Sequence, residues 1–206
     1  MRAGVFLLVL LLADDVPTRP IKFDERGRFL TMSVSLPELP DDALKRRIES
    51  GLEATIVLRV YLYREGQTQP LGLTVRTYRV QYDLWDEIYL LRIHDPQGFL
   101  NFKFKTQAEA LAKLSTLDGF PLATLDKVPR NVRHFVAVIV EVNPVSPEHL
   151  AEVRRWLSRP GSSERITGGE TFFGSFVSLF VNNKVTEAER VLKFRSQSFS
   201  RPEAPK

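Results

Sequence analysis

Apolar and polar residues alternate through much of the first half of the chain, with the period of two that half-buried β-strands show. The alternation predicts strands in residues 24–36, 53–65, 73–85, 86–95 and 98–105. Short polar turns separate the last four, and a parallel crossover needs a dozen or more residues, so we expect these strands to pair antiparallel. The longest alternation predicts a core-facing row of Ile56, Leu58, Val60 and Leu62.

Three segments have the apolar spacing and end signals of short helices. They are residues 39–52, residues 106–117 with a Thr106–Glu109 capping box, and residues 146–157 with Ser146 as cap. Residues 131–144 are almost wholly apolar, which predicts a central strand with Val136, Val138 and Val140 buried. Runs of consecutive strands indicate an α+β fold: a mainly antiparallel β-sheet or sandwich of about six strands, with three helices covering a face or an end.

The amino-terminal residues have the order of a secretory signal peptide. An apolar run from Val5 to Leu12 follows Arg2 and ends at Ala13. As a helix, this segment would rise about 16 Å, too little to span a hydrocarbon core of about 30 Å. The pattern predicts a signal peptide at residues 1–13 and a periplasmic or secreted protein. The alternative is a buried amino-terminal strand or helix.

A second apolar segment lies near the carboxyl end, in residues 169–184, after a polar linker at residues 159–171. It is too short to cross a bilayer, which needs about 20 residues. At helical spacing it presents one apolar stripe, which either packs on the core of its own domain or docks a protein partner. The predicted partner-binding residues are Phe172, Phe173, Phe176, Val177 and Phe180.

These segments divide the chain into four parts. After the signal peptide comes an antiparallel α+β domain at residues 14–158, then the linker, then a helix–strand appendage and tail at residues 172–206. Residues 188–199 are expected to return to the sheet as a strand, with Leu192 and Phe194 assigned to opposite faces.

Composition narrows the possible functions. The 206 residues include 29 Lys and Arg against 25 Asp and Glu, a net charge of +4, and no run of five like charges. Scattered charge of this kind is typical of solvated surfaces and does not predict nucleic-acid binding. Because the chain has no cysteine, disulfides, thiolate metal sites and a thiol nucleophile are excluded.

The sequence offers no motif for catalysis, for a metal or for a cofactor. It lacks the H-E-x-x-H, G-x-S-x-G and phosphate-binding glycine patterns. One hairpin gathers acidic residues and a histidine, which are more typical of an exposed turn than of a site: Asp83, Asp86, Glu87, His94 and Asp95. The alternative function, a carboxylate-dependent hydrolase, would need two of Asp83, Asp86 and Glu87 within about 5–10 Å of each other.

The middle of the chain, from about Phe29 to Leu157, resembles a bacterial family called domain of unknown function 4390. The resemblance is carried by "DALKRRIESGLEATIVLRVYLY", "RTYRVQYD", "FKTQAEALAKL" and "HFVAVIVEVN". The chain departs from the family at "REGQTQP", where the family is rich in tryptophan. The resemblance implies an exported or membrane-proximal protein, in some cases encoded near nitrogen-regulation-type sensor kinases, and it supplies no catalytic residues.

The sequence therefore predicts a non-catalytic domain of the bacterial envelope that acts by protein–protein or ligand interaction. The resemblance implies that it is an accessory to a membrane sensor system. Its expected partner is another envelope protein, and contact with the membrane surface stays open. Few Lys or Arg residues flank the apolar segment at residues 169–184, which disfavours an anionic membrane.

Overall fold

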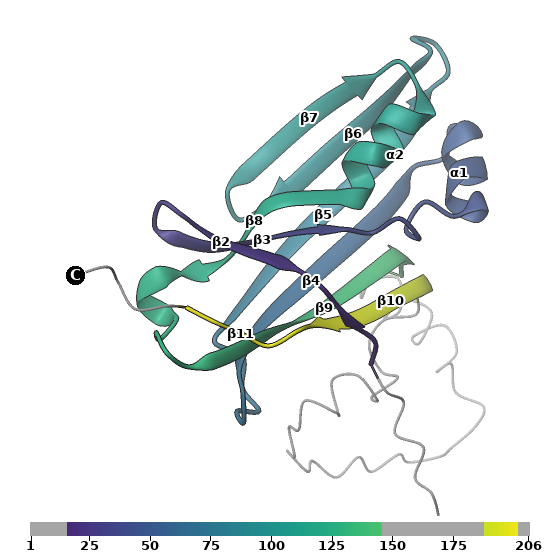
Figure 1. Ribbon diagram of the computed structural model, residues 1–206. Coiled ribbons are helices and arrows are strands. Elements are labelled where there is room, and N and C mark those ends of the chain that lie inside the picture. Colours follow the sequence, from purple (N-terminus) through teal and green to yellow (C-terminus); the bar gives the residue numbers. More distant parts are fainter. Residues whose placement is uncertain (1–15, 146–187, 202–206) are drawn as a thin grey trace, which may run out of the picture.

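The computed structural model describes residues 16–145 and 188–201, which form two β-sheets and two α-helices (Figure 1). The larger sheet has the strand order β1-β10-β9-β4-β5-β6-β7, and β11 also pairs with β9. Its strands are β1 (Thr18–Arg19), β4 (Ala54–Arg64), β5 (Gly72–Asp83), β6 (Ile88–Asp95), β7 (Gly98–Phe104), β9 (Arg133–Pro144), β10 (Ala188–Ser196) and β11 (Phe199–Ser200).

The smaller sheet has three strands in the order β2-β3-β8. They are β2 (Lys22–Arg26), β3 (Phe29–Ser35) and β8 (Thr116–Thr124), and the short 3-10 helix η1 (Leu125–Lys127) follows. This sheet lies across the same face of the larger sheet that helices α1 (Asp42–Glu49) and α2 (Gln107–Ser115) cover toward one end (Figure 1). The described pairings are antiparallel apart from β1 with β10, so the mainly antiparallel character is confirmed.

The core lies between the two layers, where the predicted faces of β4 and β9 meet. The side chains expected there are at most 1% exposed, which confirms the prediction: Ile56, Leu58, Val60, Leu62, Val136, Val138 and Val140. Cross-strand pairing places Leu58 opposite Val140 and Val60 opposite Val138. The helices add Leu44, Ile48, Leu111 and Leu114 to the same cluster.

The helix prediction is correct only in part. Asp41 caps α1 by accepting a hydrogen bond from the Leu44 amide, and the expected Thr106–Glu109 capping box begins α2. The described residues contain two α-helices rather than three, because the third predicted helix, at residues 146–157, lies outside them. Helix α2 also ends at Ser115, so the predicted helical end at residues 116–117 is wrong.

Strand β8 begins there and was not predicted, although it forms an edge of the smaller sheet. Its register against β3 shifts twice, and the shifts place Leu117, Phe120 and Leu122 in the core at uneven spacing. A β-bulge adds a residue to one strand and so breaks the period of two. The single strand predicted at residues 24–36 is wrong, because these residues form the β2–β3 hairpin, with Gly27 at a φ of 57° in its turn. Strand β2, strand β8 and the short strands β1 and β11 together explain why the structure has more than the expected six strands.

Residues 188–199 do return to the sheet as a strand, as predicted. Strand β10 is an interior strand between β1 and β9, and Phe194 is 0% exposed. The assignment of Leu192 and Phe194 to opposite faces is wrong, because alternate residues of a strand share a face. Leu192 lies opposite Val140 and Phe194 opposite Val138, and both pack on the core.

Candidate functional site

The outer face of β5, β6 and β7 carries a surface hollow that is lined in part by polar groups. Alternation turns Tyr78, Val80, Leu91 and Ile93 toward the core. The intervening residues therefore point away from the smaller sheet. Register sets them in two rows across the three strands: Thr77–His94–Phe99 and Arg79–Arg92–Asn101.

The first row presents a flat aromatic surface. The rings of His94 and Phe99 are stacked, with centroids 4.1 Å apart and planes at 4°. Phe99 is nevertheless 76% exposed, so one side of this stack faces solvent. The pair is a surface on which a flat or apolar group can pack.

A tight hairpin places these two rings opposite each other. Asp95 pairs with Gly98, and the Asp95 carboxylate accepts a hydrogen bond from the Gln97 amide at 2.9 Å. Gly98 has a φ of 130°, a conformation that residues with a side chain rarely adopt. The turn residues of the sequence "DPQG" thus fix the register that makes His94 a neighbour of Phe99.

The second row is cationic. Arg79 and Arg92 lie directly opposite each other on neighbouring strands, and both are exposed. Arg79 has one acidic neighbour, Glu53, at a long 3.9 Å between Nε and Oε1. Arg92 forms no ion pair within the part of the chain that the structure describes. Like charges directly opposite each other in a sheet destabilise it, so this row leaves positive charge that an anion would relieve.

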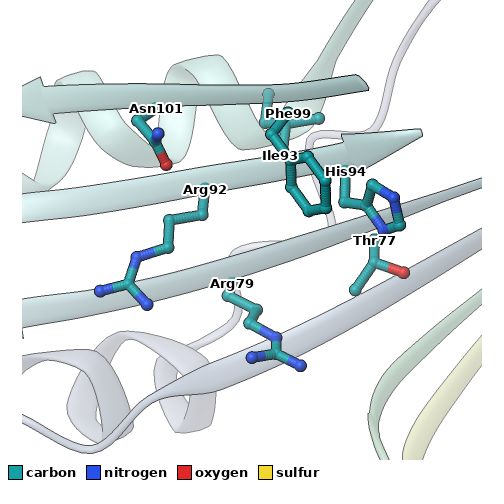
Figure 2. A pocket seen from close by; sticks show the side chains of 7 residues that line it. All are labelled: Thr77, Arg79, Arg92, Ile93, His94, Phe99 and Asn101. Atoms are coloured by element: carbon teal, nitrogen blue, oxygen red, sulfur yellow. The ribbon is translucent and has the colours of Figure 1, made fainter. Parts of the chain in front are cut away.

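The two rows line a hollow of about 450 Å³ (Figure 2). Figure 2 shows the guanidinium groups of Arg79 and Arg92 on one side of the hollow and the His94–Phe99 stack on the other. Asn101 adds an amide that can both donate and accept a hydrogen bond. The arrangement suits a carboxylate or phosphate joined to a flat apolar part, because a guanidinium binds either anion through two parallel hydrogen bonds.

Two other hollows offer fewer charged side chains with which a ligand could pair. One of about 330 Å³, beside α2, is lined by Arg76 and Asp118, whose charges are already paired with Asp95 and Arg26. Another of about 440 Å³, lined by Arg28, Thr74 and several apolar residues, lies where β3 and β8 approach the β6–β7 turn.

The acidic residues and the histidine that the sequence gathers in the β5–β6 region do not form one cluster in the structure. Asp83 accepts hydrogen bonds from the backbone amides of Trp85 and Asp86, so it stabilises the β5–β6 turn. His94 and Asp95 lie at the other end of β6, about 20 Å away at the rise of a strand. Asp95 is buried and paired with Arg76. The described residues contain no group of three or more His, Cys, Asp or Glu that could hold a metal.

The predicted partner-binding residues Phe172, Phe173, Phe176, Val177 and Phe180 lie outside the described residues, as do the predicted signal peptide and linker. Sequence reasoning did not single out Arg79, Arg92, Phe99 and Asn101. The signal was present, because the alternation in residues 73–105 assigns each of them to a polar face.

Comparisons of the chain with family models, with curated proteins and with solved structures found no match. Within residues 16–145 and 188–201, no helix has both the length and the apolar character needed to cross a bilayer.

Proposed function

We propose that this protein is a non-catalytic binding domain of the bacterial envelope, and that it binds an anionic group at the outer face of β5–β7. The observation that carries the proposal is the opposed pair Arg79 and Arg92, which has a stacked aromatic surface beside it and only a distant carboxylate neighbour. The envelope location is supported by the apolar run near the amino terminus and by the family resemblance.

Binding here needs no rearrangement of the sheet. The hollow lies on paired strands, and the Asp95 hydrogen bonds hold the turn beside it. Fixed donors lose little conformational entropy when a ligand arrives, which favours binding. The function follows from the positions of existing side chains, and no step of bond making or breaking is required.

The test is a titration with two small probes, N-acetylphenylalanine and phenyl phosphate, followed by backbone amide NMR. We expect shifts confined to β5–β7 at probe concentrations up to about 10 mM, which would detect a Kd of about 1 mM. Arg92→Gln should weaken binding about tenfold, as expected when an exposed charge-assisted contact is lost. Arg46→Gln, which removes an equal charge from the exposed side of α1, is the matched control. Shifts elsewhere, or equal binding by both variants, would refute the site.

The carboxylate-dependent hydrolase has its three acids close together in the chain, but none of them lines any of the three hollows described above. Asp83 is occupied in the turn, and Asp86 and Glu87 lie beside it in the exposed turn rather than at the hollow. A glycosidase pair needs two carboxyl groups facing a substrate cleft.

The apolar residues at 172–180 stay a predicted second contact surface for a protein partner. Deleting everything after Gly168 cannot test them, because the deletion also removes β10 and the buried Phe194. Substituting Phe173, Phe176 and Phe180 together with serine leaves β10 intact. A lower Tm would assign these side chains to the core, and an unchanged Tm would support a role at the surface.

A further inference from the structure

Strand β7 is the last strand of the larger sheet, and its outer edge pairs with no other described strand (Figure 1). It also forms one wall of the hollow, through Phe99 and Asn101. A strand edge presents a row of backbone donors and acceptors that can pair with another extended chain. The hollow and the open edge are therefore parts of one surface.

The hairpin register determines which backbone groups face outward. Asp95 and Gly98 close a two-residue turn, and the closing pair of such a hairpin is the hydrogen-bonded type. Pairs then alternate along the ladder, so Leu100 bonds inward to Ile93. The amide and carbonyl groups of Phe99, Asn101 and Lys103 point toward the free edge. Their side chains share the outer face with the hollow.

The side chains at this edge favour one kind of partner. Phe99 and Leu100 are 76% and 55% exposed, which gives the edge an apolar contact on each face. Lys103 and Lys105 are exposed and basic, and Lys103 lies opposite Leu90 rather than opposite an acid. Lysine on an edge strand repels basic edges. By charge complementarity, the same residues attract an acidic one.

We propose that β7 binds an extended acidic peptide segment of a partner protein, which adds to the sheet as an antiparallel strand. The inference rests on the proposed anion site and names its ligand. Backbone bonds to Phe99, Asn101 and Lys103 hold the added strand. Carboxylates on its outer face reach Lys103 and Arg92.

A glutamate carboxylate on the added strand can reach Arg92. An added strand would lie one spacing of about 4.8 Å from β7 and two spacings, about 10 Å, from β6. A glutamate side chain and an arginine side chain extended toward each other cover that distance. Asn101 stands between them in the row and is short, so it leaves the path to Arg92 open.

The test uses a short end-blocked peptide of alternating glutamate and valine, added to the full-length protein and followed by backbone NMR. In an antiparallel strand opposite Asn101, the glutamate amides point toward β7 and the valine amides point away. Methylating the glutamate amide nitrogens should weaken binding at least about tenfold, since each lost backbone bond removes a partner. Methylating the valine amide nitrogens leaves charge, length and composition the same, and this peptide should bind as the unmethylated one does.

A pair of protein variants gives an independent measurement. Asn101→Pro removes the outward amide without removing a bond to β6, and it should bind the peptide at least about tenfold more weakly than Asn101→Ala. If the proline variant does not fold, the methylated peptides still decide the question.

The outcomes separate the two proposals. Equal binding of both methylated peptides, with loss in Arg92→Gln, would overturn strand addition and leave the anion site standing. No binding of any peptide, together with no binding of phenyl phosphate, would refute both. A single-stranded oligothymidylate that bound more tightly than the peptide, and lost binding in Arg92→Gln, would assign the surface to nucleic acid and overturn the peptide proposal.

Discussion

Arg76 and Asp95 form a largely buried ion pair that fixes the β6–β7 hairpin to β5. Arg76 Nε and Nη2 donate to the same Asp95 oxygen at 2.9 and 2.6 Å, and the two side chains are 15% and 6% exposed. The Arg76 guanidinium also lies 4.6 Å from the ring centre of Phe120, which belongs to the smaller sheet. One arginine thus joins the turn beside the candidate site to the second layer of the fold.

Breaking the Arg76–Asp95 ion pair should lower the free energy of unfolding. Asp95→Ala leaves the buried Arg76 charge without its partner, and it also removes the acceptor for the Gln97 amide. We expect the free energy of unfolding to fall by about 3–5 kcal/mol, measured by urea denaturation. Asp86→Ala, in the exposed turn at the other end of β6, should change it by less than about 0.5 kcal/mol. A comparable small effect at Asp95 would show that the pair does not hold the hairpin.

Leu58 tests the predicted core face of β4. The side chain is 1% exposed and lies opposite Val140 on β9 and Arg76 on β5. Leu58→Ala should lower the free energy of unfolding by about 2–5 kcal/mol, because it leaves a cavity between packed layers. Leu73→Ala is the control, since that leucine on β5 is 51% exposed. A loss below about 0.5 kcal/mol for Leu58 would contradict the assignment of this face.

His134 should make the fold sensitive to acid. Its side chain is fully buried at the start of β9, with its ring centre 5.7 Å from that of Phe199. Burial lowers the pKa of His134, and the nearby charges of Arg64 and Arg201 lower it further, while the Val132 backbone acts in the opposite direction.

The sign of the effect follows from proton binding. The unfolded chain binds the His134 proton below a pKa of about 6.5, and the folded chain binds it only at lower pH. Stability contributed by the neutral ring is therefore complete above about pH 6.5 and is lost as the pH falls toward the folded pKa. His134→Phe should remove this part of the pH dependence, measured as urea midpoints at about pH 7.5 and about pH 5. An unchanged slope in the variant would mean that other groups cause the acid sensitivity.

Export remains a prediction from the sequence, and a direct measurement can test it. If residues 1–13 are a signal peptide, mass spectrometry of the protein recovered from its native cells should show a new amino terminus near Asp14. The protein should also fractionate with the periplasm. An intact Met1 in a cytosolic fraction would refute the envelope location but would leave the proposed anion site untouched.

The sequence predicts the central strands and β3 of the smaller sheet, but it does not predict β8. In β4 and β9 the core positions repeat without interruption, so Leu58 and Val138 could be assigned directly. In β8 two register shifts interrupt the period, and Gly119 and Pro121 look like turn residues when read alone. Strand β8 accommodates Gly119 and Pro121 because it is bulged and pairs with β3, and this pairing cannot be read from the sequence of β8 alone.

The candidate site shows a similar limit. Alternation places Arg79 and Arg92 on polar faces of two strands, but only the register makes them neighbours. That register depends on the length of the β5–β6 turn, and a shift by one residue would move Arg92 to the other face. The family resemblance supplies no site residues. The two arginines of the proposed anion site therefore become neighbours only through the pairing of β5 with β6.

Repulsion between Arg79 and Arg92 should lower the free energy of unfolding, and removing either arginine should restore it. Arg79 and Arg92 are directly opposite in an antiparallel pair, where like charges destabilise by about 0.2–1 kcal/mol. Arg92→Gln should therefore raise the free energy of unfolding slightly, although it weakens binding of phenyl phosphate. A double-mutant cycle with Arg79→Gln isolates the repulsion between the two, because each single variant already relieves it. The coupling should shrink at about 1 M salt, where the screening length is about 3 Å. A coupling of zero at low salt would show that solvent already separates the two charges, and the argument for an unrelieved cationic row would fail.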